Sequence, residues 1–82
     1  MLDSTTAAER LRATRMSLGL SQSRLARVSG ISRFKLCTYE LGDRSLSADE
    51  QNRVRRALHA EAERLRRISA DFDLVGLGGQ HD

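Results

Sequence analysis

The sequence predicts an all-α protein, and three observations favour that class. The chain of 82 residues contains no proline, the residue that interrupts a helix most strongly. Leucine, alanine and arginine, which all form helices readily, are abundant along it. No segment alternates apolar and polar residues with β-branched side chains, so no strand is expected. A chain of this length is expected to form one small domain with a thin core.

The first helix is marked at both of its ends. Thr6 and Glu9 have the spacing of a capping box, in which a hydroxyl and a carboxylate accept hydrogen bonds from the first backbone amides. Leu11 and Leu18 are seven residues apart and share one face. Gly19 can adopt the left-handed conformation that often follows a helix. These signals predict a helix over about residues 7–18.

Two short helices are expected next. Ser21 can cap the second helix, Leu25 and Val28 are expected on its buried side, and Gly30 ends it. Ser32 follows only two residues later and can cap a third helix, which ends at residue 42. So short a connection predicts a sharp angle between the two helices and not an antiparallel hairpin.

The fourth helix is expected to be long. Ser47 and Glu50 form a second capping box, and no helix breaker follows before Gly76. We therefore expect one continuous helix over about residues 48–70, followed by an apolar, glycine-containing tail over residues 71–82. Apolar residues with 4-3 spacing mark one side of this helix, with Glu61 at the remaining position of the series: Val54, Leu58, Leu65, Ile68 and Phe72.

The charge pattern narrows the function without deciding it. The net charge is +3, and residues 1–35 carry seven cations against two acidic residues. Thirteen of the fourteen cations are arginine, which bonds phosphate with two parallel N–H groups. Such a surface could bind a nucleic acid, or it could be an ordinary solvated surface without a charged partner. Composition alone leaves both readings open.

Several classes of protein are disfavoured. The single cysteine, Cys37, excludes an internal disulfide and a cysteine zinc cage. No apolar run is long enough to cross a membrane, and the first residues do not resemble a secretion signal, so a cytoplasmic protein is expected. His59 and His81 fit no metal or catalytic pattern. We therefore expect no enzyme, no catalytic residue, no metal and no cofactor.

The order of signals between residues 20 and 42 is that of a known motif. Leu20–Ala26 (LSQSRLA), Gly30–Ser32 (GIS) and Leu36–Gly42 (LCTYELG) follow one another. This pattern resembles the helix-turn-helix of the Cro and phage-repressor type, the XRE-like family, over about residues 8–60. The resemblance implies a compact bundle of four or five helices whose third helix enters the major groove of DNA. Ten positions carry it: Gln22, Leu25, Ala26, Gly30, Ile31, Ser32, Leu36, Tyr39, Glu40 and Gly42.

Four residues of the third helix are expected to read bases. A step of about 100° per residue places them within one arc of about 140°, facing away from Leu36 and Tyr39. They are Arg33, Phe34, Cys37 and Thr38.

Each of these residues has an expected role. Arg33 suits a two-pronged hydrogen bond to guanine, and Thr38 can offer a hydroxyl or a methyl group to a base edge. Phe34 either contacts a thymine or a sugar or folds back over the second helix. Cys37 is favoured as a small residue facing the groove over a redox sensor.

Other residues are expected to contact the DNA backbone or to support the fold. The resemblance implies that Gln22 binds a phosphate, and Lys35 and Arg44 flank the third helix as further phosphate contacts. It also implies a structural ion pair between Arg15 and Glu40, with Arg15 a candidate for phosphate contact as well. The chain departs from the family at residue 24, which is arginine where an acidic residue is common, and in lacking a break after the fourth helix.

The long helix predicts a homodimer. Leu65, Ile68 and Phe72 lie too far along it to reach the first three helices if it runs straight, so a second copy of the chain is the expected partner. The alternative is a bend that returns the tail to the bundle. The tail itself either docks on the dimer or binds another protein.

The favoured function is a sequence-specific regulator of transcription. We expect residues 1–70 to be a DNA-binding domain of a dimeric repressor, encoded by a bacterium or phage, which reads an inverted repeat in double-stranded DNA and joins the nucleoid when bound. Two alternatives are an antitoxin of a toxin–antitoxin pair, with the tail on the toxin, and a protein-interaction module that has lost DNA binding.

Overall fold

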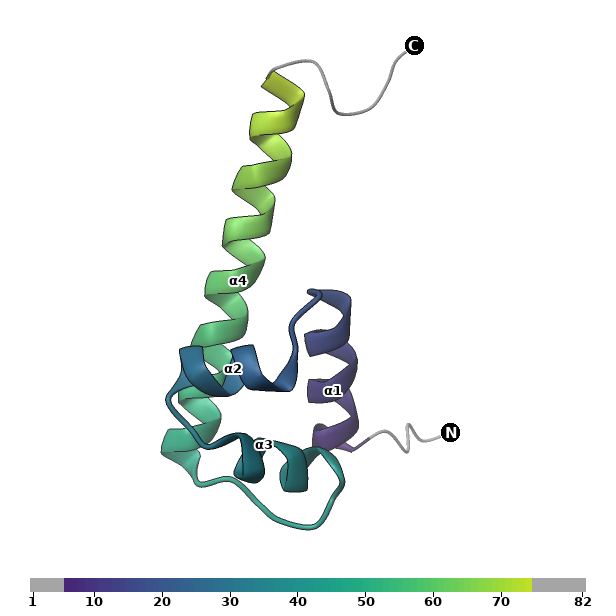
Figure 1. The fold of residues 1–82 in the computed structure, drawn as a ribbon, viewed down its shortest axis with the longest axis vertical. Coiled ribbons are helices and arrows are strands. Elements are labelled where there is room, and N and C mark those ends of the chain that lie inside the picture. The colour runs from purple at the N-terminus through teal and green to yellow at the C-terminus, as the bar shows by residue number, and fades with distance from the viewer. Residues whose placement is uncertain (1–5, 75–82) are drawn as a thin grey trace.

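Four α-helices make up the computed structural model, which describes residues 6–74, with residues 72–74 described by their backbone alone. They are α1 (Ala7–Ser17), α2 (Gln22–Ser29), α3 (Arg33–Glu40) and α4 (Ala48–Leu74). The described residues contain no strand, so the predicted all-α class is confirmed. Figure 1 shows the three short helices and the first half of α4 packed together, while the second half of α4 extends beyond them.

Local capping explains where each helix begins. The Thr6 hydroxyl accepts from the Glu9 amide and the Glu9 carboxylate accepts from the Thr6 amide, so the predicted capping box of α1 is confirmed. Ser21 and Ser32 cap α2 and α3 as predicted, each accepting from the amide three residues on. The second predicted capping box also forms, since the Ser47 amide donates to Glu50 and the Glu50 amide donates to Ser47.

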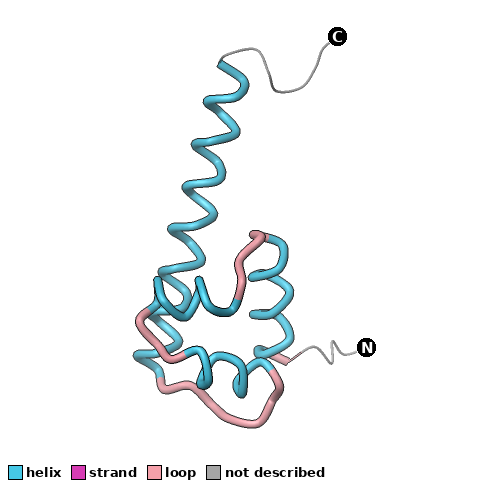
Figure 2. The backbone as a smooth tube through the Cα atoms, viewed as in Figure 1, coloured by secondary structure: helices cyan, strands magenta, loops and turns pink. Residues whose placement is uncertain are grey.

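Glycines end the three short helices. Gly19, Gly30 and Gly42 all have positive φ, at 71°, 76° and 87°. Such a backbone strains any residue with a Cβ, so the chain can leave each helix abruptly at these points. The tube in Figure 2 shows the short connections on both sides of α2 and the longer loop that follows α3.

The core lies where α2 and α3 meet the first half of α4. Leu25 and Leu36 are completely buried, and both were predicted to be inside. Around them the core adds five more buried apolar residues: Leu20, Ala26, Ile31, Leu46 and Val54. Leu11, Leu18, Tyr39, Ala57 and Leu58 pack against this cluster while half-buried.

One expected core residue lies outside. Val28 was predicted on the buried side of α2 with Leu25, but it is 51% exposed. In its place, Ser29 is buried and donates its hydroxyl to the carbonyl oxygen of Leu25 at 2.6 Å. The buried side of α2 therefore carries Leu25, Ala26 and Ser29, and Val28 lies outside it.

The long helix α4 runs without a break for 27 residues. At about 1.5 Å per residue it is roughly 40 Å long. The expected continuous helix is thus confirmed, and the bend that would return the tail to the bundle is absent through Leu74. The expected start of the tail at residue 71 is wrong, because α4 continues to residue 74. None of the described helices is long and apolar enough to cross a membrane.

Candidate nucleic-acid interface

The outer side of α3 carries the four residues predicted to read bases. Arg33 and Phe34 are exposed, and Cys37 and Thr38 are half-buried. The opposite side packs inward, where Leu36 is completely buried. The predicted division of α3 into a buried and an exposed side is confirmed.

Arg33, Phe34 and Cys37 together line a shallow, open hollow of about 350 Å³. Within the described part of the chain, Arg33 makes no hydrogen bond or ion pair. Its guanidinium can therefore turn its N–H groups outward without breaking an internal contact. An open hollow with one cation and two apolar walls suits the edge of a base better than it suits a small ligand, which needs a deeper site.

Arg44 holds the ring of Phe34 in an exposed position. Its guanidinium carbon lies 5.6 Å from the ring centroid, within the range of a cation–π contact. Phe34 is 68% exposed, so the alternative in which it folds back over α2 is wrong. Arg44 comes from the α3–α4 loop, and the contact places this cation directly beside the outer side of α3.

The hydroxyl of Thr38 is already engaged. It donates to the carbonyl oxygen of Phe34 at 2.8 Å, one turn earlier in α3. What Thr38 can present outward is its methyl group and the lone pairs of its oxygen. Its expected hydroxyl donation to a base would require this internal hydrogen bond to break.

Leu41 also belongs to the outer side of α3, and our sequence reasoning missed it. It is the C-cap of α3 and is 69% exposed. Steps of about 100° place it between Cys37 and Phe34 around the helix axis. Extending the same helical projection by one residue past Glu40 would have found it.

A buried ion pair connects α1 to α3. Arg15 Nε donates to Glu40 Oε2 at 2.8 Å and Arg15 Nη2 donates to Glu40 Oε1 at 2.9 Å. The side chains are only 10% and 2% exposed. The predicted pair is confirmed. A third bond, from Arg15 Nη1 to the carbonyl oxygen of Leu20 at 2.8 Å, completes the fork. Arg15 is thus buried, with three of its five N–H groups engaged, and the phosphate contact expected of it stays a prediction.

The Glu40 carboxyl stays ionised in this setting. Burial by itself raises its pKa, but hydrogen bonds from Arg15 and Gln22 and the charges of Arg15 and Arg12 outweigh burial. The pKa of Glu40 therefore lies below its ordinary value of 4.5. An ionised Glu40 keeps the fork of Arg15 occupied across the usual pH range.

Gln22 is part of the same network. Its Nε2 donates to Glu40 Oε1 at 3.0 Å, so its side chain is tied to the Arg15–Glu40 pair at the start of α2. An amide nitrogen carries two N–H groups, and the second can still point outward. A phosphate contact by Gln22 would therefore use a side chain that is already positioned.

Lys35 has an unexpected partner. Its Nζ lies 2.5 Å from Glu50 Oε2, in the first turn of α4. This hydrogen bond, together with that from the Ser47 amide, lowers the pKa of Glu50 from 4.5 to about 2. Lys35 is 40% exposed along its side chain. It joins α3 to α4, a role that our sequence reasoning did not assign to it.

In the second half of α4, Leu65 and Ile68 lie outside the apolar core of the described residues. Leu65 is half-buried and Ile68 is 38% exposed. The side chain of Phe72 lies outside the described residues. Glu61 does not continue this series toward a partner helix, because it faces Arg24 of α2 at 3.7 Å and also pairs with Arg64.

Open apolar space lies between α1 and α4. One hollow of about 370 Å³ is lined by Leu11, Tyr39, Leu46, Val54 and Leu58 among others. A second, nearer the second half of α4, includes Leu18, Leu58 and Ala62. The two hollows share Thr14, Arg55 and Leu58.

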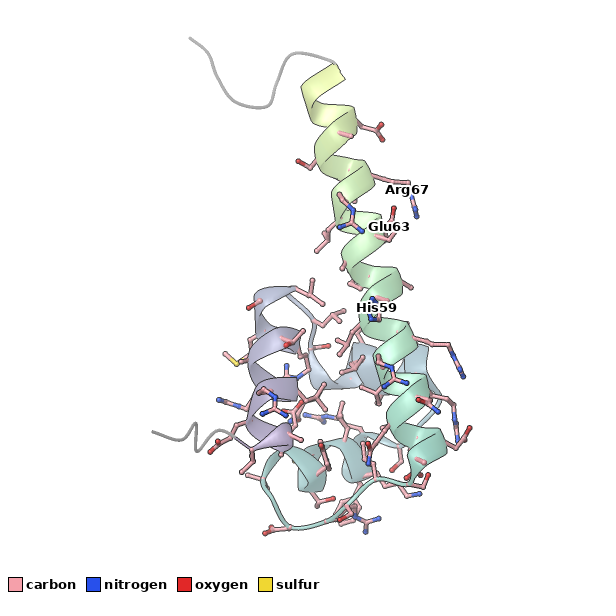
Figure 3. All side chains as sticks on the ribbon, turned by 180° about the vertical axis from the view of Figure 1, so that it is seen from behind. His59, Glu63 and Arg67 are labelled. Atoms are coloured by element: carbon pink, nitrogen blue, oxygen red, sulfur yellow. The ribbon has the colours of Figure 1, made fainter. Side chains whose placement is uncertain are left out.

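The outward side of the second half of α4 is polar. Figure 3 labels Glu63 and Arg67 on this half of α4, with His59 below them and nearest to the α1–α3 cluster. Glu63 pairs with Arg66 and, at 3.9 Å, with Arg67. Among the described residues, no three His, Cys, Asp or Glu side chains gather in a group that could hold a metal ion.

Comparison with protein-family models, with curated proteins and with solved structures finds no match to this chain.

Proposed function

We propose that the protein is a sequence-specific regulator of transcription that binds double-stranded DNA through α3. In this proposal α3 lies in the major groove and Arg33 reads a guanine through a pair of hydrogen bonds to O6 and N7. Gln22, Lys35 and Arg44 contact the phosphates beside it, and these contacts set the register of the protein on the duplex.

One observation carries the proposal: Arg33 stands exposed and without an internal partner in the described chain, at the rim of an open hollow on α3. Helix α3 is held from behind by the Arg15–Glu40 pair, and the Lys35–Glu50 pair joins it to the first turn of α4 while leaving two N–H groups of Lys35 for a phosphate. A rigidly held helix that offers an unpaired guanidinium is what base recognition needs. The cations on and beside α3, which are Arg33, Lys35 and Arg44, argue against the alternative of a protein-interaction module that has lost DNA binding.

We further propose that the protein acts as a symmetric homodimer. Leu65 and Ile68 extend beyond the α1–α3 cluster, next to the apolar hollows between α1 and α4. A second copy that packs its α4 along this side would cover both features at once. Two-fold symmetry would present two α3 helices about 34 Å apart, so the site should be an inverted repeat with half-site centres about 10–10.5 base pairs apart or a multiple of that.

Selection from random duplex DNA tests the proposed function. We expect wild-type protein to enrich a motif, with an affinity that falls steeply as salt rises because phosphate contacts release counterions. Arg33→Ala should lose about 1–3 kcal/mol on that motif and relax the preference at one base pair. Arg67→Ala, on the outward side of α4, is the matched control and should keep the motif. A motif unchanged by Arg33→Ala would contradict the assigned reading side of α3.

A further inference from the structure

The outer side of α3 is unusually apolar for a surface that would face DNA. Phe34 is 68% exposed and Leu41 is 69% exposed, and half-buried Cys37 lies between them along the helix. We call these three residues the apolar strip. Large apolar side chains exposed together indicate a surface that contacts something apolar in use.

The length of the apolar strip matches the length of a few base-pair steps along DNA. From Phe34 to Leu41 is seven residues, which advance a helix by about 10 Å. Successive bases along a strand are about 3.4 Å apart, so the strip runs past about three base-pair steps. Arg33 stands at the beginning of the strip and shares the hollow with Phe34 and Cys37.

Only one group in the major groove of DNA is apolar. The 5-methyl group of thymine projects there, whereas the other base edges present hydrogen-bond donors and acceptors. Resting on the proposed function, we infer that the apolar strip reads thymine methyl groups and that Phe34 reads the one adjacent to the guanine bound by Arg33. The recognised half-site would therefore contain a guanine with a neighbouring thymine, and Leu41 would contact a second thymine further along.

The contact with Arg44 supports this assignment. The Arg44 guanidinium carbon lies 5.6 Å from the centroid of the Phe34 ring, and this contact favours the exposed orientation of the ring. The hollow with Arg33 and Cys37 then presents the ring to the base beside the guanine. Thr38 adds a methyl group next to the strip, since its hydroxyl is bonded to the Phe34 carbonyl oxygen.

Replacing thymine by deoxyuridine tests the inference, because it removes the methyl group and leaves every hydrogen-bonding atom. In the selected motif, each thymine is exchanged in turn and the affinity of the full-length protein is measured. We expect the exchange of the thymine next to the guanine that Arg33 reads to weaken wild-type binding about fourfold. This ratio corresponds to ~0.8 kcal/mol, the free energy of burying one group of the size of a methylene. Phe34→Ala should bind the two duplexes with nearly equal affinity, and Leu41→Ala should lose discrimination at a different thymine.

A matched variant and three distinct outcomes keep the inference open to refutation. Met16→Ala removes an exposed apolar side chain of α1 and should keep the fourfold ratio. Equal binding of thymine and uracil duplexes by the wild type would overturn the inference and leave DNA binding intact. Full discrimination retained by Phe34→Ala would overturn it too, because another residue would then contact the methyl group. Failure to enrich any duplex would overturn the proposed function itself.

Discussion

The buried Arg15–Glu40 pair fixes how α1 packs against α3. Both charges are withdrawn from water, which costs several kcal/mol per ion. That cost is offset by two parallel hydrogen bonds to Glu40, the bond from Arg15 to the Leu20 carbonyl and the bond from Gln22. If one partner is removed, the other charge stays buried without compensation. The pair therefore makes the arrangement of α1 against α3 specific, and with it the position of the outer side of α3.

A double-mutant cycle on Arg15 and Glu40 tests this role. Arg15→Met or Glu40→Met alone should each destabilise the fold by about 3–5 kcal/mol, and the double variant should be more stable than either single one. The coupling energy from urea unfolding should exceed the 0.2–1 kcal/mol typical of exposed pairs. The exposed Glu63–Arg67 pair is the control and should couple weakly. A coupling near zero for Arg15 and Glu40 would reduce them to independent charges.

At the scale of a single element, the beginning of α4 combines two functions. Glu50 closes the capping box with Ser47 and also pairs with Lys35 of α3. The same carboxylate therefore starts the long helix and attaches the proposed recognition helix to it. Arg53 adds a second attachment nearby, since its Nη1 donates to the carbonyl oxygen of Gly30 at 2.9 Å in the turn between α2 and α3.

The lowered pKa of Glu50 predicts a pH dependence with a definite sign. Its folded pKa of about 2 lies below the ordinary 4.5, so its contribution to stability is fully present above pH 4.5 and is lost as pH falls toward 2. Glu50→Gln should therefore lower the melting temperature at pH 7, and the difference from wild type should shrink between pH 4.5 and pH 2. Circular dichroism melts across that range measure it.

Two controls locate this effect at the Lys35–Glu50 contact. In a Lys35→Met background the pH-dependent part of the Glu50→Gln difference should diminish, because the hydrogen bond from Lys35 is the largest cause of the lowered pKa. Glu63→Gln, whose partners lie on its own helix, should have a smaller effect. A Glu50→Gln difference that is constant from pH 7 to pH 2 would show that protonation of this carboxyl does not matter.

At the scale of the whole molecule, the fold is one small cluster with a long helix extending from it (Figure 1). Among residues 6–71, whose burial is described, the core has only seven buried apolar residues, and α1 and α4 leave open space between them. A domain with so small a core is often completed by a partner surface. The second half of α4, which offers Leu65 and Ile68, is the surface available for that purpose.

The proposed dimer predicts that changes at Leu65 and Ile68 dissociate it. Each apolar side chain buried there contributes roughly 1.5–3 kcal/mol, and symmetry doubles the contribution. Leu65→Asp with Ile68→Asp should therefore give a monomer in sedimentation experiments at micromolar concentration. The α1–α3 cluster should stay helical, because neither residue belongs to its core.

The control for the dimer is Ala60→Asp with Ala70→Asp, which adds the same charges at two exposed positions of α4 that do not line the hollows between α1 and α4. This variant should stay dimeric, as should the wild type. A monomeric wild type, or a Leu65 and Ile68 variant that still dimerises, would contradict the proposed interface.

The starts of the four described helices could be predicted from the sequence because capping is a local interaction. Thr6, Ser21, Ser32 and Ser47 each act on an amide three residues ahead, and glycine can take a positive φ wherever the chain turns. The division of α3 into two sides follows from the helical period in the same way. None of these features depends on how distant segments meet.

Contacts between helices could not be predicted so well, because they depend on how each helix is rotated against its neighbours. The side of α2 that meets α4 left Val28 exposed, although its spacing from Leu25 is that of a buried pair. The pairing of Lys35 with Glu50 and of Arg24 with Glu61 joins residues far apart in the chain, and local periodicity contains no information about it. The Arg15–Glu40 pair was anticipated only through a resemblance; its burial and its link to Gln22 follow from the packing of three helices around one carboxylate.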